Sequence, residues 1–121
     1  MAQILIIEDN LMLRKMISKQ MEIEGHQVFE AANGALGIDI FDQQTIDIVI
    51  TDIFMPEKEG IETIIELREK SQEVKIIAIS VGGRDESVDY LALAKNLGAD
   101  RIFKKPVRMI DLRKAVNELL G

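Results

Sequence analysis

The sequence contains no cysteine, and this absence removes several kinds of site. A disulfide scaffold, a zinc site with thiolate ligands and a cysteine nucleophile are all excluded. No apolar run approaches the length that a membrane-spanning helix needs. The first residues, Met1–Ile4, lack the basic and long apolar stretches of a signal peptide, so we expect no leader. A soluble cytoplasmic protein is therefore the default prediction.

Positive charge is also scarce. The chain has 15 Lys and Arg against 21 Asp and Glu, a formal net charge of −6. Direct binding of nucleic acid needs a basic surface, and this balance argues against it. Apolar residues make up 47% of the chain and charged residues 30%, which is typical of a globular protein. A chain of 121 residues can bury a hydrophobic core without disulfides or a structural metal, so we expect one domain over residues 1–121.

Short apolar runs alternate with amphipathic stretches along the whole chain. Five strands are predicted, at 3–7, 26–31, 46–52, 75–80 and 101–104. A helix is predicted after each strand, beginning after Asn10, at Ala35, at about Ile61, near Asp85 and after Pro106. The predicted buried positions include Met16 in the first helix and Ile65 in the third.

This alternation has short connections throughout, so it predicts parallel strands joined by right-handed crossovers, with helices on both faces of one sheet. The expected fold is a doubly wound (βα)5 α/β domain with the flavodoxin-like strand order 2-1-3-4-5.

Polar residues stand where the apolar runs end. Asp52 closes a β-branched run, where a charge is costly unless it is paired or used. Glu8 and Asp9 follow the first run, Ser80 closes the fourth, and Lys105 follows the fifth. In a doubly wound sheet, ligands bind at the carboxyl ends of the strands, beside the first strand. We therefore expect these five side chains to share one pocket.

The residue types in that pocket favour metal-assisted phosphoryl chemistry. Grouped carboxylates repel each other, and a hard divalent cation such as Mg²⁺ would relieve the repulsion. An ammonium and a hydroxyl on the other side suit a phosphoryl group. Taken singly, these residues have ordinary alternatives: Asp9 or Asn10 as the cap of the first helix, and Ser80 and Lys105 as turn residues. Their coincidence at one edge favours the functional interpretation.

The chain holds an ordered set of motifs: Glu8-Asp9, Asp52-Ile53-Phe54-Met55-Pro56 with Gly60, Ser80, Gly98-Ala99-Asp100 and Lys105-Pro106. This set resembles the receiver domain of two-component response regulators over essentially the whole chain. The resemblance implies a phosphorelay switch, with no dedicated enzymatic activity. Its phosphodonor would be a phosphohistidine on a sensor histidine kinase or on a histidine phosphotransfer protein.

By the same resemblance, Asp52 is the phosphoacceptor, a carboxylate that becomes 4-aspartylphosphate. Asp9, Asp52 and the backbone carbonyl of Phe54 would bind Mg²⁺, and Glu8 would act directly or through water. Lys105 would contact the phosphoryl oxygens, and Ser80 would close on them.

The resemblance also concerns the surroundings of the pocket. A cis peptide bond is expected at Pro106, as in the family. The only histidine, His26, is expected on the surface near the amino side of the sheet, which makes it a poor phosphodonor. A downstream target protein is expected on the face of the fourth helix, fifth strand and fifth helix, and a homodimer is a second option.

The sequence departs from the usual family pattern at four places. Ile102 replaces an aromatic residue, and Phe103 is one residue too late and faces the other side, so we expect a switch by loop or helix movement. Phe54 and Val81 are bulky at the pocket rim, and we expect them to slow loss of the phosphoryl group. The stretch 81–86 is longer than usual and contains two glycines, which predicts a loop that closes on the phosphate.

Two other functions stay open. One is a passive interaction module that has the fold without phosphorylation. The other is a metal-dependent phosphatase with Asp52 as nucleophile, although such enzymes need a second aspartate where this chain has Phe54. We expect no output domain after the fifth helix, which leaves two options: a stand-alone regulator, or a receiver excised from a longer protein.

Overall fold

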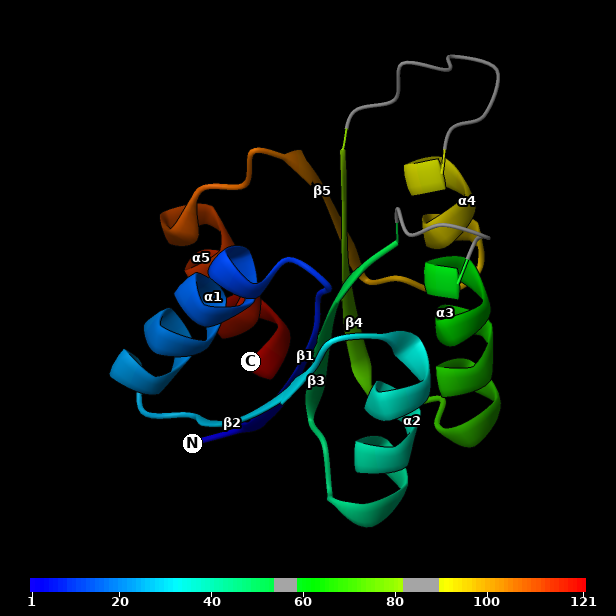
Figure 1. Cartoon of the computed structure of the whole chain (residues 1–121), viewed down its shortest axis with the longest axis horizontal. Coiled ribbons are helices and arrows are strands. Elements are labelled where there is room, and N and C mark those ends of the chain that lie inside the picture. Colours follow the sequence, from blue (N-terminus) through cyan, green and yellow to red (C-terminus); the bar gives the residue numbers. More distant parts are fainter. Residues whose placement is uncertain (54–58, 82–89) are drawn as a thin grey trace.

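A computed structural model of the chain describes residues 1–53, 59–81 and 90–121. Its centre is one parallel sheet in the order β2-β1-β3-β4-β5 (Figure 1). The strands are β1 (Gln3–Ile7), β2 (Gln27–Ala31), β3 (Ile48–Asp52), β4 (Lys75–Val81) and β5 (Arg101–Lys105). The predicted strand order and the doubly wound α/β fold are both confirmed.

Helices cover both faces of the sheet. They are α1 (Leu11–Ile23), α2 (Gly34–Gln43), α3 (Glu59–Lys70), α4 (Tyr90–Asn96) and α5 (Met109–Leu120). In Figure 1, α1 and α5 lie on one side of the sheet, and α2, α3 and α4 on the other. The expected start of the fourth helix, near Asp85, lies outside the described residues.

Each face of the sheet has its own hydrophobic core, because successive strand residues point to opposite sides. In β1, Leu5 and Ile7 contribute to the core under α2–α4, whereas Ile4 and Ile6 contribute to the core under α1 and α5. All four side chains are fully buried. The near-continuous apolar runs of the sequence follow from this two-sided burial.

Asparagine side chains begin the first two helices. The Oδ1 atom of Asn10 accepts a hydrogen bond from the backbone N–H of Leu13 at 2.9 Å, and Asn33 does the same for Leu36. Each side chain satisfies one of the N–H groups that a helix leaves unpaired at its start. The first cap fixes α1 directly after Glu8 and Asp9, the acidic pair of the predicted site.

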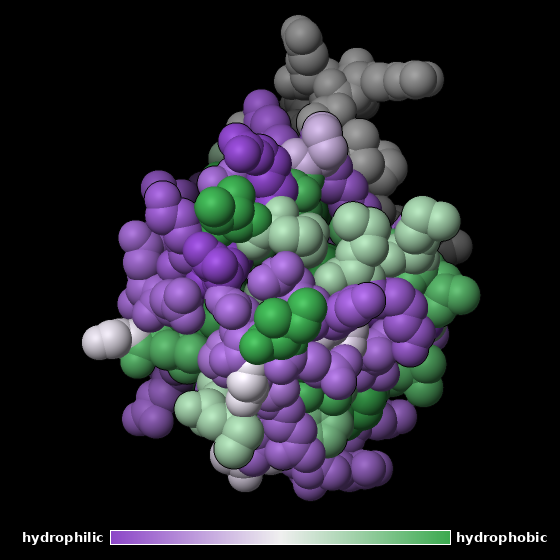
Figure 2. Space-filling view, turned by 90° about the vertical axis from the view of Figure 1, so that its left-hand side faces the viewer, coloured by the Kyte–Doolittle hydropathy of each residue, from purple (hydrophilic) through white to green (hydrophobic). Residues whose placement is uncertain are grey.

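Several predicted core positions are wrong, among them one in α1 and one in α3. Met16 of α1 is 51% exposed and Ile65 of α3 is 39% exposed. On α3 the buried stripe runs through Ile61, Ile64 and Leu67, and the next residue after Ile64 is turned about 100° towards solvent. Figure 2 shows the α1 and α5 side of the molecule, where hydrophobic side chains lie among hydrophilic ones. Among the described residues, no helix is both long and apolar enough to cross a membrane.

Candidate functional site

The site begins with two buried carboxylates on neighbouring strands. Ile7 of β1 pairs with Thr51 of β3, and Glu8 and Asp52 each follow this pair by one residue. The backbone N–H of Glu8 donates to Ala31 O at 3.0 Å, which continues the ladder to β2. Glu8 is 2% exposed and Asp52 is 3% exposed. Parallel pairing thus places both acids side by side at the carboxyl edge of the sheet.

Asp9 completes a group of three carboxylates. Oxygen atoms of Glu8, Asp9 and Asp52 all lie within 4.8 Å of one another. Asp9 is exposed, whereas the other two are buried, so the group opens to solvent on one side. These are carboxylate oxygens, the donors that hard divalent cations prefer, and their spacing fits such an ion.

Lys105 reaches this group from the far edge of the sheet. Its Nζ atom lies 2.8 Å from Asp52 Oδ2 and 3.1 Å from Glu8 Oε1. The peptide bond between Lys105 and Pro106 is cis, as the resemblance implied. One ammonium therefore faces both buried carboxylates.

The pKa values of Glu8 and Lys105 reflect the close packing of charged groups at this edge. Burial raises the pKa of Glu8 to about 7, and a hydrogen bond with Asp9 and the charge of Asp52 act in the same direction. The Asn10 N–H, 3.0 Å from Glu8 Oε2, and the ammonium of Lys105 oppose this rise. Burial lowers the pKa of Lys105, but the bonds to Asp52 and Glu8 outweigh it, and the net shift is upward. A further cation would relieve the remaining repulsion among the carboxylates.

Ser80 stands at the same edge of the sheet. It is 2% exposed and lies one residue beyond Ile79, the partner of Asp52 in the sheet register. The structure therefore brings Glu8, Asp9, Asp52, Ser80 and Lys105 to one edge. Phe54, the remaining predicted metal ligand, lies outside the described residues.

The residues near the end of β5 follow the predicted alternation. Ile102 packs against the core under α2–α4, and Phe103 packs against the core under α1 and α5. The two side chains thus occupy opposite faces of the sheet, as predicted. Val81 ends β4 and pairs with Lys105, and the rest of the predicted loop, 82–86, lies outside the described residues.

Gly60 belongs to the site for a steric reason. A Cβ atom on Gly60 would lie 2.3 Å from Ile53 Cα and 2.8 Å from Asp52 O. The first turn of α3 therefore lies directly against the end of β3, closer than any side chain allows. Gly60 is part of the sequence motif quoted above, and the close approach of the two backbones explains why a glycine is needed at this position.

Arg14 was missed by the sequence analysis. Its position in the helical pattern put it away from the core, yet its Nη1 donates to the backbone carbonyl of Glu8 at 2.9 Å. A main-chain acceptor leaves no trace in a sequence pattern, so the contact could not be found from residue types.

His26 lies far from this edge. It directly precedes β2, at the amino end of the parallel sheet. It is half-buried rather than fully on the surface, and its Nδ1 accepts the backbone N–H of Ala2 at 3.1 Å. This placement agrees with its exclusion as a phosphodonor.

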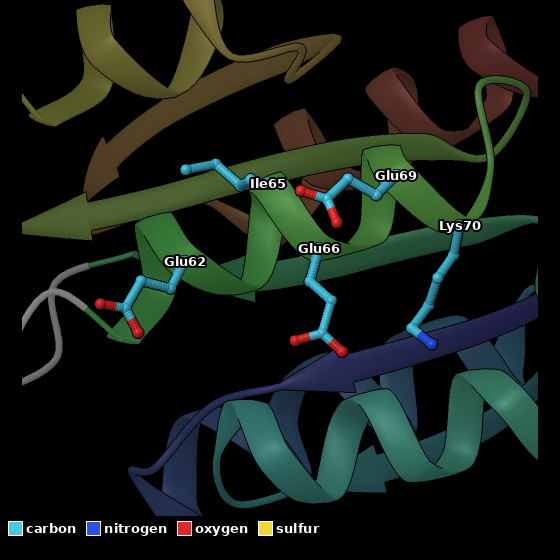
Figure 3. A pocket seen from close by; sticks show the side chains of 5 residues that line it. All are labelled: Glu62, Ile65, Glu66, Glu69 and Lys70. Atoms are coloured by element: carbon cyan, nitrogen blue, oxygen red, sulfur yellow. The ribbon is translucent and has the colours of Figure 1, made fainter.

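A groove of about 570 Å³ on the outer side of α3 is a different feature (Figure 3). It is lined by Glu62, Ile65, Glu66, Glu69 and Lys70. Figure 3 shows Glu66 and Lys70 extending towards α2, and Lys70 pairs there with Asp42 at 2.9 Å. None of the predicted site residues lines this groove.

The fold and the acidic edge together define a class: regulatory receiver domains, in which a parallel (βα)5 sheet presents carboxylates and a lysine at its carboxyl ends. Comparison with known proteins gives the same answer. Residues 4–117 match the response regulator receiver domain family, and the chain belongs to this family.

Individual relatives differ in how much of their length the chain spans. Sporulation initiation phosphotransferase F of Bacillus subtilis is 30% identical, with 98% of this chain and 93% of that protein covered. Aerobic respiration control protein ArcA of Escherichia coli is 37% identical over 98% of this chain, which spans 48% of that protein. A crystal structure of a response regulator receiver domain protein from Clostridium thermocellum has a TM-score of 0.88 and 30% identity, with 99% and 94% of the two chains covered.

Proposed function

We propose that residues 1–121 form a single cytoplasmic receiver domain that acts as a phosphoacceptor switch of a two-component phosphorelay. Asp52 accepts a phosphoryl group from a phosphohistidine on a sensor histidine kinase or a histidine phosphotransfer protein. The observation that carries this proposal is the contact of Lys105 with Asp52, 2.8 Å, beside the cluster of Glu8, Asp9 and Asp52. Membership of the receiver family supports it.

In the proposed transfer, a carboxylate oxygen of Asp52 attacks phosphorus in line with the leaving nitrogen. The new P–O bond gives an acyl phosphate, and the P–N bond to the donor imidazole breaks. The electron pair leaves with the imidazole nitrogen, which takes up a proton from solvent. Negative charge stays on the equatorial phosphoryl oxygens, where positive groups stabilise it.

The chain's own residues fit this step. Glu8, Asp9, Asp52 and the carbonyl of Phe54 would hold Mg²⁺, which supplies positive charge to the phosphoryl oxygens when bound. Lys105 would turn its ammonium from the carboxylates to a phosphoryl oxygen. The hydroxyl of Ser80 would donate to another and hold the phosphorylated state together.

The expected readout is altered binding of a target protein. The proposed target face consists of α4, β5 and α5, and β5 is an edge strand of the sheet. A homodimer is the second option. Because Ile102 stands in place of an aromatic residue, the switch would use movement of a loop or helix. A phosphomimic-bound structure in which the Ser80 edge has not moved would contradict that mechanism.

The direct test is incubation with Mg²⁺ and acetyl phosphate, followed by intact-mass spectrometry. We expect one phosphoryl adduct that is labile to hydroxylamine and absent from Asp52→Asn. Asp39→Asn, an exposed aspartate of α2, is the matched control and should be labelled like the wild type. No adduct, from acetyl phosphate or from any histidine kinase, would favour the passive module. Repeated release of phosphate from simple phosphomonoesters would favour the phosphatase.

A further inference from the structure

Arg14 is a charged residue of α1 whose side chain is only 15% exposed. Its guanidinium makes two directed hydrogen bonds. Nη1 donates to the backbone carbonyl of Glu8 at 2.9 Å, and Nε donates to Glu30 Oε1 at 3.2 Å. The first acceptor is main chain of the acidic pair, and the second is a side chain of β2. Arg14 therefore ties the loop after β1 to a neighbouring strand.

The carbonyl of Glu8 has a special place in the site. It belongs to the planar peptide unit that joins Glu8 to Asp9. Fixing this oxygen fixes the orientation of the unit, and with it the directions in which both side chains leave the backbone. Glu8 N–H is also bound, to Ala31 O at 3.0 Å, so main-chain groups on both sides of its Cα are held. Asp9 gains most from this, because its carboxylate is the exposed member of the cluster.

Glu30 keeps the guanidinium in place. Burial raises the pKa of Glu30, but the hydrogen bonds from Lys15 and Arg14 outweigh burial and hold that pKa below its usual value. Glu30 thus stays ionised at neutral pH and accepts both Arg14 and Lys15, the latter at 3.1 Å. Lys15 is 63% exposed. Lys15 and Arg14 both pair with Glu30. Of these two cations, Arg14 is the one that also donates to the backbone carbonyl of Glu8.

We infer that Arg14 is a positioning residue for the cation site, which acts by orienting the peptide between Glu8 and Asp9. The inference rests on the proposed function, since it concerns the affinity of that site for Mg²⁺. Outer residues that orient metal ligands are typically worth about 10- to 100-fold in metal affinity. Arg14 would act through the main chain rather than through a ligand side chain.

If Arg14 acted only through its charge, its removal would change the Mg²⁺ affinity in the opposite direction. Removal of a positive charge near a cation site favours cation binding, because less repulsion remains. Removal of the hydrogen bond from Arg14 to the Glu8 carbonyl disfavours cation binding, because the carboxylates of Glu8 and Asp9 are no longer held in their arrangement. The direction of the change in Mg²⁺ affinity therefore separates positioning from charge.

The test measures Mg²⁺ affinity by isothermal titration calorimetry for the wild type, Arg14→Met and Lys15→Met. The two variants lose the same charge and the same partner, Glu30, but only the first loses the bond to the loop. We expect about tenfold weaker binding for Arg14→Met. Lys15→Met should bind equally well or slightly more tightly. Urea unfolding confirms that each variant is folded during the titration.

Arg14→Lys is the second variant, in case Arg14→Met does not fold. It keeps the charge but replaces a planar guanidinium by a single ammonium, which cannot reproduce both directed bonds. Weaker Mg²⁺ binding with unchanged charge supports positioning. In both Arg14 variants, the rate of labelling by acetyl phosphate should recover to the wild-type value at saturating Mg²⁺, and the amide resonance of Asp9 should be shifted in the metal-free protein.

The inference is overturned if Arg14→Met and Arg14→Lys bind Mg²⁺ as tightly as the wild type or more tightly. That outcome leaves the proposed function intact, provided that the wild type binds Mg²⁺ and forms the adduct on Asp52. If the wild type itself binds no Mg²⁺ and forms no adduct, the proposed function fails, and the inference fails with it.

Discussion

The Nζ atom of Lys105 lies 2.8 Å from Oδ2 of Asp52, although the two residues are 53 positions apart. Asp52 ends β3 and Lys105 ends β5, with β4 between them. The lysine side chain therefore crosses the end of β4, and it also contacts Glu8 after β1. One ammonium connects the carboxyl ends of three strands, so its removal affects both the charge and the stability of the site.

Lys105→Met should destabilise the metal-free protein at pH 8 by roughly 1–3 kcal/mol, because two buried carboxylates lose their positive partner. Urea unfolding followed by circular dichroism measures this change. Added Mg²⁺ should restore more stability to the variant than to the wild type, since the cation replaces the lost charge. Lys104→Met, on the exposed neighbour in β5, is the matched control and should change little. Equal destabilisation by both variants would contradict the prediction.

The raised pKa of Glu8 predicts an unusual pH dependence of stability. Its pKa is about 7 in the folded protein, mainly because of burial, against 4.5 ordinarily. Between these values, the folded protein holds a proton that the unfolded chain has released, so rising pH favours unfolding. The contribution of Glu8 is fully present below about pH 4.5 and is lost by about pH 7. The loss is on the order of 3 kcal/mol.

Glu8→Gln cannot titrate and should escape this loss. The metal-free variant should therefore gain about 2–3 kcal/mol relative to the wild type between pH 5 and pH 8, measured by urea unfolding at several pH values. The stability contribution of Glu30 should depend on pH in the opposite direction, because its pKa is lowered in the folded protein. Its contribution is present above about pH 4.5 and is lost as the pH falls below that value. A stability difference between Glu8→Gln and the wild type that is the same at every pH would contradict the assignment.

The sequence was enough to predict the order of strands and the convergence of the site. Two-sided burial makes the interior of strands such as Gln3–Ile7 a continuous apolar run, and polar residues mark where such runs end. Parallel pairing then brings those ends to one edge, so Glu8 and Asp52 had to be neighbours once the fold was known. Periodicity in the sequence predicts the alternation of strands and helices, and the known topology of doubly wound sheets predicts which strand ends meet.

Contacts to main-chain groups could not be predicted in the same way. Arg14 and Arg68 look like surface cations in a helical pattern, yet both donate to backbone carbonyls of other segments. The exact phase of a helix was also beyond the pattern, because Ile64 and Ile65 are equally apolar and only packing decides which one is buried. Periodicity predicts that one face of a helix is buried, but it does not predict whether the residues at the border of that face are buried or exposed.

Gly60→Ala should destabilise the protein although alanine is the better helix former. A Cβ atom would lie 2.3 Å from Ile53 Cα, and backbone on both sides would have to shift. We expect a loss of about 1–3 kcal/mol, together with slower labelling of Asp52 by acetyl phosphate, because the end of β3 is displaced. Glu62→Ala, on the exposed side of the same helix, controls for helix propensity and should leave both unchanged or slightly improved. A stabilised Gly60→Ala would show that α3 can move freely away from β3.

Arg68→Met tests whether the amino end of the sheet is stabilised independently of the site. Arg68 is 16% exposed, and its guanidinium donates to the carbonyls of Gly98 and Val74 and pairs with Asp100 at 2.9 Å. Asp100 in turn accepts the backbone N–H of Ile76 at 2.8 Å, so the residue joins α3 to the starts of β4 and β5. We expect a loss of roughly 1–3 kcal/mol in urea unfolding, because several part-buried acceptors lose their donor.

Mg²⁺ affinity of the folded Arg68→Met variant should equal that of the wild type, since this network lies at the opposite end of the strands from Asp52. Lys70→Met is the matched control, because it also removes a cation of the last turn of α3 but breaks only an exposed pair with Asp42. It should unfold like the wild type. If Arg68→Met instead weakened Mg²⁺ binding while Lys70→Met did not, the two ends of the sheet would be coupled, and the amino-end network would have to be counted as part of the site.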